Sequence, residues 1–418
     1  MQQEIKPTGP VQAILTLPGS KSFTHRALIA AALADGDSLL THALRAEDTE
    51  LTAQALMQLG AGLAWQDALV VVQGVRGRWR TPEEPIFLGN SGTSMRFLTA
   101  VAALADGPVT LTGAPRLCQR PMGELLAALR DLGARAESTS HHDCPPVVVG
   151  GGLRGGRTRL SGATSSQYLS ALLLVGPLAP QGVAVEVTGE LVSRPYVDIT
   201  LEVMGSFGIS HYREGYRFFE VPGGQSYQAR EYVIEADASS ASYFWAAAAL
   251  TGGRVTVANL TTESAQGDID FLAVLARLGC QISSTDEGLT VMGGPLSGIE
   301  VDMANMPDMA PTLGVLAAFA QGETRITGVA HLKHKESDRL AAVARELGKM
   351  GIAAAETSDG LLIQGGQPRG AAIDTYQDHR IAMSFAVAGL KASGTVINDP
   401  ECVAKSFPDF WEYFGRLL

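Results

Sequence analysis

A repeat of about 70 residues runs through the chain and limits what it can fold into. A large apolar residue followed by Gly recurs at Leu59-Gly60, Leu132-Gly133, Phe207-Gly208, Leu278-Gly279 and Met350-Gly351. The glycines are spaced by 73, 75, 71 and 72 residues. Each follows an amphipathic segment and can supply the left-handed residue that ends a helix. The even spacing therefore predicts a chain built of repeated units.

A second pattern keeps the same period. Polar clusters open segments rich in Ala and Leu, with reference positions at Ser22, Thr93, Ser166, Ser240, Asp308 and Asp378. These helix starts predict six units, each with the order β-α-β-α-β-β. The sixth unit stops before its strands, and we expect residues 11–17 to supply the strand that closes it. The alternative is a single long α/β sheet, which the steady period disfavours.

Six such units exceed one ordinary hydrophobic core. We therefore predict an α/β protein of two domains, each made of three β-α-β-α-β-β repeats. One domain is expected at residues 17–235 and is continuous. The other combines residues 1–16 with residues 236–418.

Composition excludes several classes of partner. A net charge of −11 argues against a general nucleic-acid coat, which is normally basic. No apolar run approaches the ~20 residues of a membrane-spanning helix, and the start has no secretion-signal pattern. The four cysteines form no CxxC pair and fit a reducing cytoplasm. We expect a cytoplasmic protein that binds neither nucleic acid nor membrane.

Two helix starts carry more than a capping residue. Residues 18–22 (PGSKS) precede Arg26 by one turn, and residues 89–93 (GNSGT) precede Arg96. Free N–H groups and the positive end of the helix dipole favour an anion there. The first is not a Walker A loop, because a Ser separates its Gly from its Lys. Further basic residues stand beside turns or helix ends: Arg116, Arg120, Arg194, Lys335, Arg339, Arg380 and Lys405. A small substrate with several negative groups would account for them.

Nine segments together carry a resemblance to a known family. They are LPGSKSFTHRALIAAAL (17–33), LGNSGTSMRFL (88–98), PRLCQRPMGELLAALRDLGA (115–134), SSQYLSALL (165–173), SRPYVDITLEVM (193–204), PDMAPT (307–312), HKESDRL (334–340), QDHRIAM (377–383) and DPECVAKSFPDF (399–410). In this order, from end to end, the chain resembles the 5-enolpyruvylshikimate-3-phosphate (EPSP) synthases. The resemblance implies the enolpyruvyl transferase fold, with the active site in the cleft between the two domains.

The resemblance also implies a reaction. The enolpyruvyl group of phosphoenolpyruvate passes to the 5-hydroxyl of shikimate 3-phosphate, and phosphate leaves from a tetrahedral intermediate. This addition-elimination belongs to the shikimate pathway, which leads to chorismate and the aromatic amino acids. It needs no cofactor and no metal. The two substrates are the expected partners of a monomeric enzyme, and the family is the target of glyphosate.

Three catalytic roles are carried over by motif. Asp308 is expected to act as the base toward the 5-hydroxyl, and Glu336 to move the methyl proton, with Lys21 between the substrates. A carboxyl group that donates a proton near neutral pH needs a raised pKa, which nearby cations oppose and burial favours. Taken alone, Asp308 would be read as a helix cap, and Glu336 as an ion-pair partner of Arg339 at i+3.

Binding roles follow from the same motifs. The residues implied for shikimate 3-phosphate are Lys21, Ser22, Arg26, Ser165, Ser166, Gln167, Ser193, Tyr196, Asp308, His331 and Lys335. Those implied for phosphoenolpyruvate are Lys21, Gly92, Arg120, Gln167, Arg339, Arg380 and Lys405. Hydroxyl groups and backbone amides suit the phosphate of the first substrate, and the planar fork of Arg26 suits its carboxylate.

The chain departs from the family pattern at three positions. His331 stands where many members carry Asn, and its protonation is expected to add pH dependence. Ser91 and Phe97 replace a common Ala and Pro, and Phe97 is expected to shift the helix that carries Gly92. Gly92 itself is kept, and an Ala there marks members that tolerate glyphosate. We therefore predict that the chain is sensitive to glyphosate.

Three alternatives stay open. The sister enolpyruvyl transferase acts on UDP-N-acetylglucosamine and often has a Cys before its Arg-Pro, but Cys118 lies only two residues before Arg120, where that family's Cys lies five before. A non-catalytic binder of phosphorylated metabolites would also use basic helix starts. A metal site would draw on residues 141–144 or on His331 and His334, although neighbouring lysines oppose a cation there.

Overall fold

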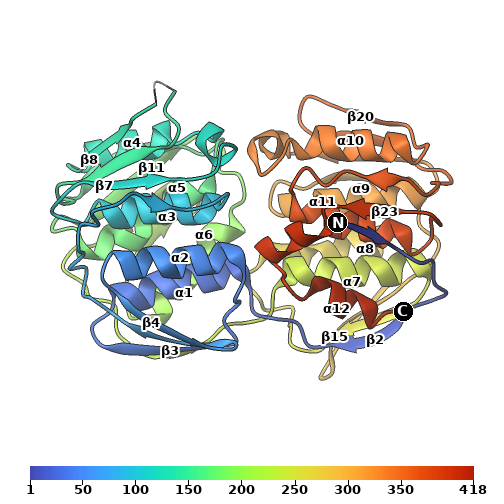
Figure 1. The fold of residues 1–418 in the computed structure, drawn as a ribbon, viewed down its shortest axis with the longest axis horizontal. Coiled ribbons are helices and arrows are strands. Elements are labelled where there is room, and N and C mark those ends of the chain that lie inside the picture. Colours follow the sequence, from blue (N-terminus) through green and yellow to red (C-terminus); the bar gives the residue numbers. More distant parts are fainter. Residues whose placement is uncertain (141) are drawn as a thin grey trace. The chain divides into compact units, whose positions relative to one another are not determined.

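The computed structural model describes residues 1–140 and 142–418, and the chain divides into two compact units. Unit 1 comprises Met1–Leu17 and Ala236–Leu418, and unit 2 comprises Pro18–Glu235. The chain therefore passes from one unit to the other twice, and unit 1 is discontinuous (Figure 1). Within the described residues, no helix is both long and apolar enough to cross a membrane.

Unit 2 alternates helices with short strands. Its helices are α1 (Lys21–Leu33), α2 (Glu47–Gln58), α3 (Gly92–Ala102), α4 (Gly123–Asp131), α5 (Ser166–Val175) and α6 (Pro195–Ser206), with 3-10 turns η1 (Leu117–Gln119) and η2 (Gly176–Leu178). Its strands are β3 (Asp37–Thr41), β4 (Gly62–Gln66), β5 (Leu69–Gln73), β6 (Ile86–Phe87), β7 (Val109–Thr112), β8 (Arg135–Ser138), β9 (Val147–Gly150), β10 (Gly156–Ser161), β11 (Val183–Thr188), β12 (Tyr212–Glu214), β13 (Phe218–Val221) and β14 (Glu231–Val233).

These strands form four-stranded sheets of one design. The orders are β14-β3-β5-β4, β6-β7-β9-β8 and β10-β11-β13-β12. The first two strands of each sheet run parallel, and an antiparallel hairpin completes it. A parallel pair needs a crossover, which a helix supplies, whereas a hairpin needs only a turn. Each sheet with its helices is therefore one β-α-β-α-β-β repeat, as the sequence predicts.

Unit 1 repeats this design in two four-stranded sheets, and its third sheet has three strands. Its helices are α7 (Ala238–Thr251), α8 (Phe271–Leu278), α9 (Ala310–Phe319), α10 (Arg339–Lys349), α11 (His379–Gly389) and α12 (Phe410–Gly415), with 3-10 turns η3 (Gly267–Asp270), η4 (Pro307–Met309), η5 (Ala330–His334) and η6 (Pro400–Lys405). Its strands are β1 (Gln2–Glu4), β2 (Gln12–Leu15), β15 (Arg254–Val257), β16 (Gln281–Thr285), β17 (Gly288–Met292), β18 (Glu300–Asp302), β19 (Glu323–Thr327), β20 (Ala354–Glu356), β21 (Leu361–Gln364), β22 (Ala372–Ile373) and β23 (Val396–Asn398). The sheet orders are β16-β17-β15-β2, β18-β19-β21-β20 and β1-β23-β22.

The expected pairing of the N-terminal strand is wrong. Residues 11–17 were expected to close the sixth repeat, but β2 pairs in parallel with β15 and so belongs to the fourth repeat. The sixth repeat is closed instead by β1, antiparallel to β23. The strand that precedes α7 in sequence, β14, stays in unit 2 beside β3, so the fourth repeat must take its first strand from elsewhere. The periodicity of the sequence therefore predicts how many repeats there are, but it does not predict which strand pairs with which.

The helix caps follow the predicted pattern. In four of the six predicted helix starts, the N-cap side chain accepts a hydrogen bond from a backbone N–H of the first turn; these residues are Ser91, Ser165, Asp237 and Asp378. Such bonds satisfy amide groups that have no partner inside the helix. At α1, Ser20 occupies the N-cap without a side-chain cap bond.

The helices that open the repeats form the core of each unit. In unit 1, α7 is buried at every residue except Ser239, and α11 is buried throughout. Helices that are apolar on all sides must be surrounded by protein. Accordingly, α7, α9 and α11 pack against one another, as α3 and α5 do in unit 2. The starts of these helices carry the candidate site residues.

The last helix is fixed by an aromatic cluster. Phe410 of α12 is fully buried, and its ring lies 5.9 Å from that of Tyr243 and 6.3 Å from that of Phe244, both on α7. Phe407 and Phe414 complete the contact, at 5.8 and 5.3 Å from Phe410. Aromatic pairs at these separations add to the burial of their area.

Phe410→Ala is expected to lower the free energy of unfolding by about 3–5 kcal/mol, because it leaves a cavity between α12 and α7. Chemical denaturation followed by circular dichroism measures this change. Trp411→Phe, in the same helix but half-buried, is the control, with an expected cost below about 1.5 kcal/mol. Equal stability of Phe410→Ala and the parent would show that α12 does not contribute to the core.

Candidate active site

Arg339 is the centre of an ion network in unit 1. Its Nε donates to Asp378 Oδ2 at 2.8 Å. Its terminal nitrogens donate to Asp308 Oδ1 at 2.9 Å and to Glu336 Oε2 at 2.8 Å. Arg339 is 2% exposed, so a charge this deep requires such partners. The Glu336–Arg339 pair has the i,i+3 spacing that the sequence indicated.

The protonation of Arg339 is secured by these carboxylates. Burial by itself lowers the pKa of Arg339, but Asp378, Glu336 and Asp308 outweigh it and raise the pKa above its ordinary value. The guanidinium is therefore a permanent cation. Glu336 and Asp308, the two residues with predicted acid–base roles, are brought together on one arginine.

Asp308 lies between two arginines. Its second oxygen, Oδ2, accepts from Arg380 at 2.7 Å, while Oδ1 accepts from Arg339. Arg380 is the second residue of α11 and also contacts the Tyr243 hydroxyl at 3.2 Å and Ser239 Oγ at 3.3 Å, both on α7. One buried guanidinium thus joins the start of α11 to α7 and to the turn before α9.

Asp378 was recognised in the sequence only as a helix start. It caps α11 by accepting from Arg380 N at 3.0 Å, and its carboxylate also holds Arg339 and the Ser337 hydroxyl, the latter at 2.9 Å. The cap follows from the local sequence. The bond to Arg339 spans 39 residues, and no rule based on residue spacing predicts it. Asp378 therefore orients a predicted binding residue.

Three other predicted residues belong to the same unit, and His331 lies close enough to the network to feel its charges. His331 and Lys335 are half-buried in and after η5. Burial lowers the pKa of His331 to about 3, and Lys335 acts in the same direction while Asp308 opposes it. His331 is therefore neutral near pH 7, and the expected pH dependence from its protonation is not supported. Lys405 is buried at the end of η6.

In unit 2, Lys21 is held by a buried carboxylate. Lys21 Nζ lies 3.1 Å from Asp48 Oδ2, and the Asp48 side chain is 3% exposed. Lys21 is the first residue of α1, and Asp48 belongs to the first turn of α2. Sequence reasoning missed Asp48, whose acidic position in a first turn reads as an ordinary helix-dipole residue.

Hydroxyl groups link the helix starts of unit 2. His25 Nδ1 lies 2.8 Å from Thr52 Oγ1, which lies 2.7 Å from Ser94 Oγ, which in turn lies 2.6 Å from Ser91 Oγ. The chain runs from α1 through α2 to the cap of α3. Buried hydroxyl groups that satisfy one another hold these elements in one arrangement.

Arg26 joins two predicted binding segments. Its Nε donates to Thr200 Oγ1 at 2.6 Å, and its terminal nitrogens donate to the carbonyls of Ser22 and Tyr196 at 2.8 and 2.9 Å. The guanidinium also lies 4.9 Å from the centre of the Phe97 ring. Burial lowers the pKa of Arg26 to about 9. Phe97, which departs from the family pattern, therefore packs against Arg26, a residue predicted to bind the substrate.

Gly92 is the point where two arginines approach the backbone. A Cβ at this position would overlap the guanidinium groups of Arg120 and Arg96. Arg120 is 5% exposed, and Arg96 donates to the Gly92 carbonyl at 3.0 Å. The absence of a side chain at Gly92 is thus what admits Arg120.

The remaining predicted residues of unit 2 stand at the starts of α5 and α6. Ser165 caps α5, and Ser166 is its first residue. Gln167 Nε2 donates to Thr93 Oγ1 at 3.0 Å, which joins α5 to α3. Ser193 has a left-handed φ of 55°, and Tyr196 is the second residue of α6.

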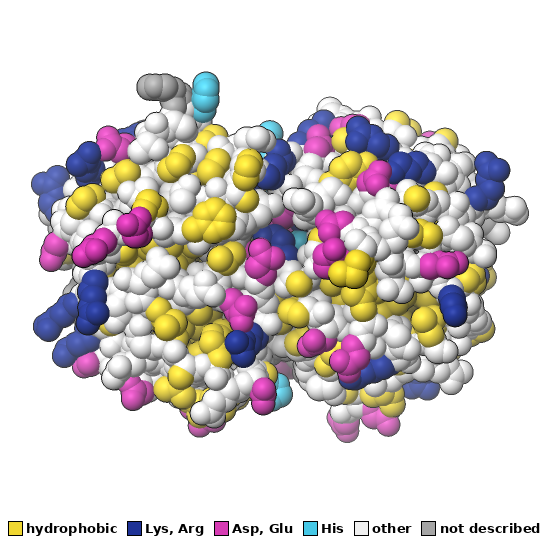
Figure 2. Space-filling model, viewed as in Figure 1, with side chains coloured by type: hydrophobic (Ala, Val, Ile, Leu, Met, Phe, Trp, Pro, Cys, Tyr) yellow, Lys and Arg dark blue, Asp and Glu magenta, His cyan; other side chains and the backbone are white. Residues whose placement is uncertain are grey.

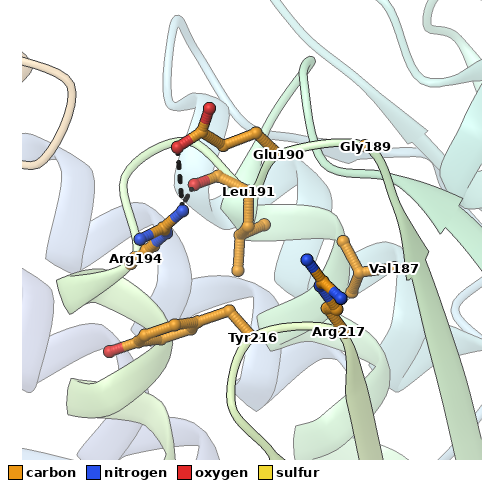
Figure 3. A pocket seen from close by; sticks show the side chains of 7 residues that line it. All are labelled: Val187, Gly189, Glu190, Leu191, Arg194, Tyr216 and Arg217. Carbon is orange, nitrogen blue, oxygen red and sulfur yellow. Dashed lines mark hydrogen bonds and ion pairs between the residues drawn. The ribbon is translucent and has the colours of Figure 1, made fainter.

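A pocket of about 670 Å³ is lined by the end of β11, the loop before α6 and the turn between β12 and β13 (Figure 3). Arg194 lines it, but this arginine is already engaged: it lies 2.9 Å from Glu190 Oε1, donates to the Leu191 carbonyl at 3.2 Å and stacks 5.2 Å from the Tyr216 ring. These contacts fix the loop before α6. On the face that Figure 2 shows, Lys and Arg side chains are interspersed with acidic ones.

Comparisons with known proteins give one answer. A family model described as EPSP synthase (3-phosphoshikimate 1-carboxyvinyltransferase) matches residues 5–414. A 3-phosphoshikimate 1-carboxyvinyltransferase of Syntrophobacter fumaroxidans is 49% identical, with 100% of both chains covered. One from Trichormus variabilis is 44% identical and covers 98% of this chain and 97% of its own. The chain belongs to the EPSP synthase family.

A solved family structure agrees. EPSP synthase from Acinetobacter baumannii has a TM-score of 0.82 at 31% identity, over 100% of this chain and 98% of that one. The predicted α/β class and enolpyruvyl transferase fold are confirmed. Family membership makes the chain a transferase of the shikimate pathway, which carries the enolpyruvyl group from phosphoenolpyruvate to shikimate 3-phosphate.

The two alternatives that involve Cys118 and a metal site receive less support from the structure. Cys118 is a half-buried free thiol that donates to the Gly113 carbonyl at 3.4 Å, which suits an ordinary loop residue. His141 lies outside the described residues. Among residues 1–140 and 142–418, no three His, Cys, Asp or Glu side chains are grouped so that they could hold a metal ion.

Arg339→Leu is expected to lower the free energy of unfolding by about 3–5 kcal/mol, because it leaves Asp308, Glu336 and Asp378 without their shared cation. Thermal denaturation at neutral pH measures the change. Arg345→Leu removes an exposed arginine from the same helix and is expected to stay within about 0.5 kcal/mol of the parent. If the two variants unfold alike, the network contributes nothing to the fold.

Proposed function

We propose that the reaction proceeds on the residues named above, with Asp308 as the base, Glu336 as the proton carrier and Lys21 between the two substrates. The observation that carries this proposal is the position of Asp308, whose two oxygens each accept from a buried arginine. An isolated binding site for anions would gain nothing from a carboxylate there. A carboxylate between two cations suits a site that both binds anions and moves protons.

The chemistry requires three kinds of group. The 5-hydroxyl of shikimate 3-phosphate must lose a proton as its oxygen bonds to C2 of phosphoenolpyruvate. The methylene carbon, C3, must gain a proton in the same step. Elimination then returns a proton from that carbon and expels phosphate from the tetrahedral intermediate. Cations must meanwhile hold two phosphates and two carboxylates.

Anionic substrates supply the trigger for both proton transfers. A substrate carboxylate or phosphate competes with Asp308 for Arg339 and Arg380, since arginine forms paired hydrogen bonds with both kinds of anion. Released from an arginine, Asp308 accepts the hydroxyl proton. The added negative charge also raises the pKa of Glu336, as a like charge does for any carboxyl group, so Glu336 can hold and donate a proton.

Unit 2 contributes the phosphate contacts. The N–H groups at the starts of α1 and α5 suit the phosphate of shikimate 3-phosphate, together with Ser22, Ser165 and Ser166. Arg26 uses three of its five N–H donors on the protein, which leaves two for the substrate carboxylate. Ser193, Tyr196 and Gln167, with His331 and Lys335 of unit 1, complete the proposed contacts.

The residues that we propose for phosphoenolpyruvate are divided between the two units of the chain. Lys21, Gly92, Arg120 and Gln167 belong to unit 2, and Arg339, Arg380 and Lys405 to unit 1. We further propose a cytoplasmic monomer without cofactor or metal. The four cysteines are all free thiols, as a reducing compartment would keep them.

Phosphate release from phosphoenolpyruvate tests the proposal. Shikimate 3-phosphate and UDP-N-acetylglucosamine are offered as acceptors in separate reactions with the purified chain. Release with shikimate 3-phosphate alone is expected. Release only with the UDP-sugar would overturn the acceptor and restore Cys118 as a candidate. No release with either, from folded protein, would favour a metabolite-binding protein.

Glu336→Gln is expected to reduce kcat by about 10²–10⁴-fold, because the amide cannot carry the proton. Its shape and its contact with Arg339 are largely kept, so the Kd for shikimate 3-phosphate should change less than about threefold. Steady-state kinetics and calorimetry separate the two effects. Glu356→Gln removes a surface partner of Lys333 as control. Unchanged turnover in Glu336→Gln would exclude Glu336 as the proton carrier.

Gly92→Ala is expected to raise KM for phosphoenolpyruvate by about tenfold, a cost near 1.4 kcal/mol, because its methyl group displaces Arg120 and Arg96. Both side chains are flexible at their ends, so the fold should survive. The same variant should lose sensitivity to glyphosate, which the parent is predicted to show. Gly205→Ala, on α6 with open space around it, is the matched control. An unaltered KM would remove Gly92 and Arg120 from the site.

A further inference from the structure

A buried carboxyl group lies behind the proposed site and takes no part in the mechanism above. Asp268 belongs to η3 and is 4% exposed. Its Oδ2 accepts a hydrogen bond from the hydroxyl of Ser239 on α7. Its other oxygen, Oδ1, is buried without a hydrogen-bond partner among the described residues. An ionised carboxylate with an unsatisfied buried oxygen is costly, so this group is poised to take up a proton.

The Ser239 hydroxyl connects Asp268 to the site. Ser239 Oγ lies 3.3 Å from a terminal nitrogen of Arg380, and the same nitrogen lies 2.7 Å from Asp308 Oδ2. A continuous path therefore runs from Asp268 through Ser239 and Arg380 to Asp308. A hydroxyl that accepts from a guanidinium donates its single proton onward, here to Asp268.

The loop that carries Asp268 is fixed to the start of α7. Gln266 Oε1 accepts from Ala238 N at 3.0 Å, and Gln266 Nε2 donates to the Ala236 carbonyl at 2.7 Å. These two hydrogen bonds join the Gln266 side chain to the backbone on each side of Asp237 and hold η3 against the start of α7. The position of Asp268 relative to Ser239 is therefore set by the fold rather than by a mobile loop.

The charges around Asp268 leave it close to half-ionised near neutral pH. Burial raises the pKa of Asp268 to about 7, and the charge of Asp308 adds to this, while Arg380 and the Ser239 bond lower it and Asp237 raises it. Arg380 lies on α11, Asp308 in the turn before α9 and Asp237 before α7, so these charged groups come from the starts of three helices.

We infer that Asp268 is a positioning residue that sets, through Ser239, how strongly Arg380 is available to an anionic substrate. Neutral Asp268 leaves the Arg380 charge to the substrate and Asp308. Ionised Asp268 adds a competing negative charge and weakens the hold on phosphoenolpyruvate. By linkage, substrate binding next to Arg380 favours the protonated form of Asp268, so binding is accompanied by proton uptake. This inference rests on the proposed role of Arg380.

The test compares KM for phosphoenolpyruvate in Asp268→Asn and the parent between pH 6 and pH 8.5. Asn mimics the neutral acid, so the two KM values should agree at pH 6. By pH 8.5 the parent KM should be about three- to tenfold the higher, since only the parent gains the charge. The ratio of the two enzymes cancels the ionisation of the substrate itself. A ratio that stays constant over this range would overturn the inference.

Two further variants make the result specific. Ser239→Ala removes a hydrogen bond that favours the ionised form, so the rise in KM should move to higher pH; an unmoved rise contradicts the path through Ser239. Asp270→Asn, exposed in the same 3-10 turn, should keep the parent profile. Because the raised pKa means that the ionised carboxyl destabilises the fold above pH 7, Asp268→Asn should be no less stable than the parent there.

The same assays separate this inference from the proposed function. If the parent releases no phosphate with shikimate 3-phosphate, the proposed function fails. If it does release phosphate while the ratio of KM values is flat with pH, only the role of Asp268 fails.

Discussion

The starts of three buried helices are joined in unit 1 by a single guanidinium. Arg380, on α11, contacts Ser239 on α7 and Asp308 before α9, and the three helices pack against one another. The positive ends of their dipoles therefore meet in one region, and a buried arginine adds to that charge. Such an arrangement is stable only if carboxylates are gathered there as well. The acidic residues of the site are thus a requirement of the fold before they are a means of catalysis.

The sequence predicted the repeating design because it depends on local signals. Glycines end helices, and polar residues begin them, at intervals that can be counted along the chain. Four side-chain caps, among them Ser91 and Asp378, confirm that use of local pattern. The pairing of Gln12–Leu15 with Arg254–Val257 could not be found in this way. The strand lies some 240 residues from its partner, and every repeat offers it a similar parallel edge.

The site divides along the same line. Asp308, Glu336 and Lys21 are proposed from motifs, whereas the Glu336–Arg339 contact was expected from its spacing of three residues and is observed. The carboxylates that contact the basic residues of the site were not predicted as site residues. Asp48 pairs with Lys21, Asp378 pairs with Arg339, and Asp268 is linked to Arg380 through Ser239. Each of these lies at a helix start or in a 3-10 turn, where an acidic residue has a sufficient local explanation. The partners of these acidic residues are set by helix packing, which cannot be read from the spacing of residues along the sequence.

Both units join the starts of neighbouring helices, but they do so with different side chains, and this difference bears on the function proposed for each unit. In unit 2 the helix starts are linked chiefly by hydroxyl groups, from His25 through Thr52 to Ser94 and Ser91. Lys21 is paired with Asp48 there, but the hydroxyl links add no negative charge at the positive helix ends, which suits the proposed binding of phosphate. In unit 1 the links are carboxylates on arginines, so an arriving anion must displace a carboxylate from its cation. A displaced carboxylate is a stronger base than a paired one, which is how we propose that binding is coupled to proton transfer. This difference supports our proposal that acid–base chemistry uses the carboxylate-rich helix starts of unit 1 and phosphate binding the hydroxyl-linked starts of unit 2.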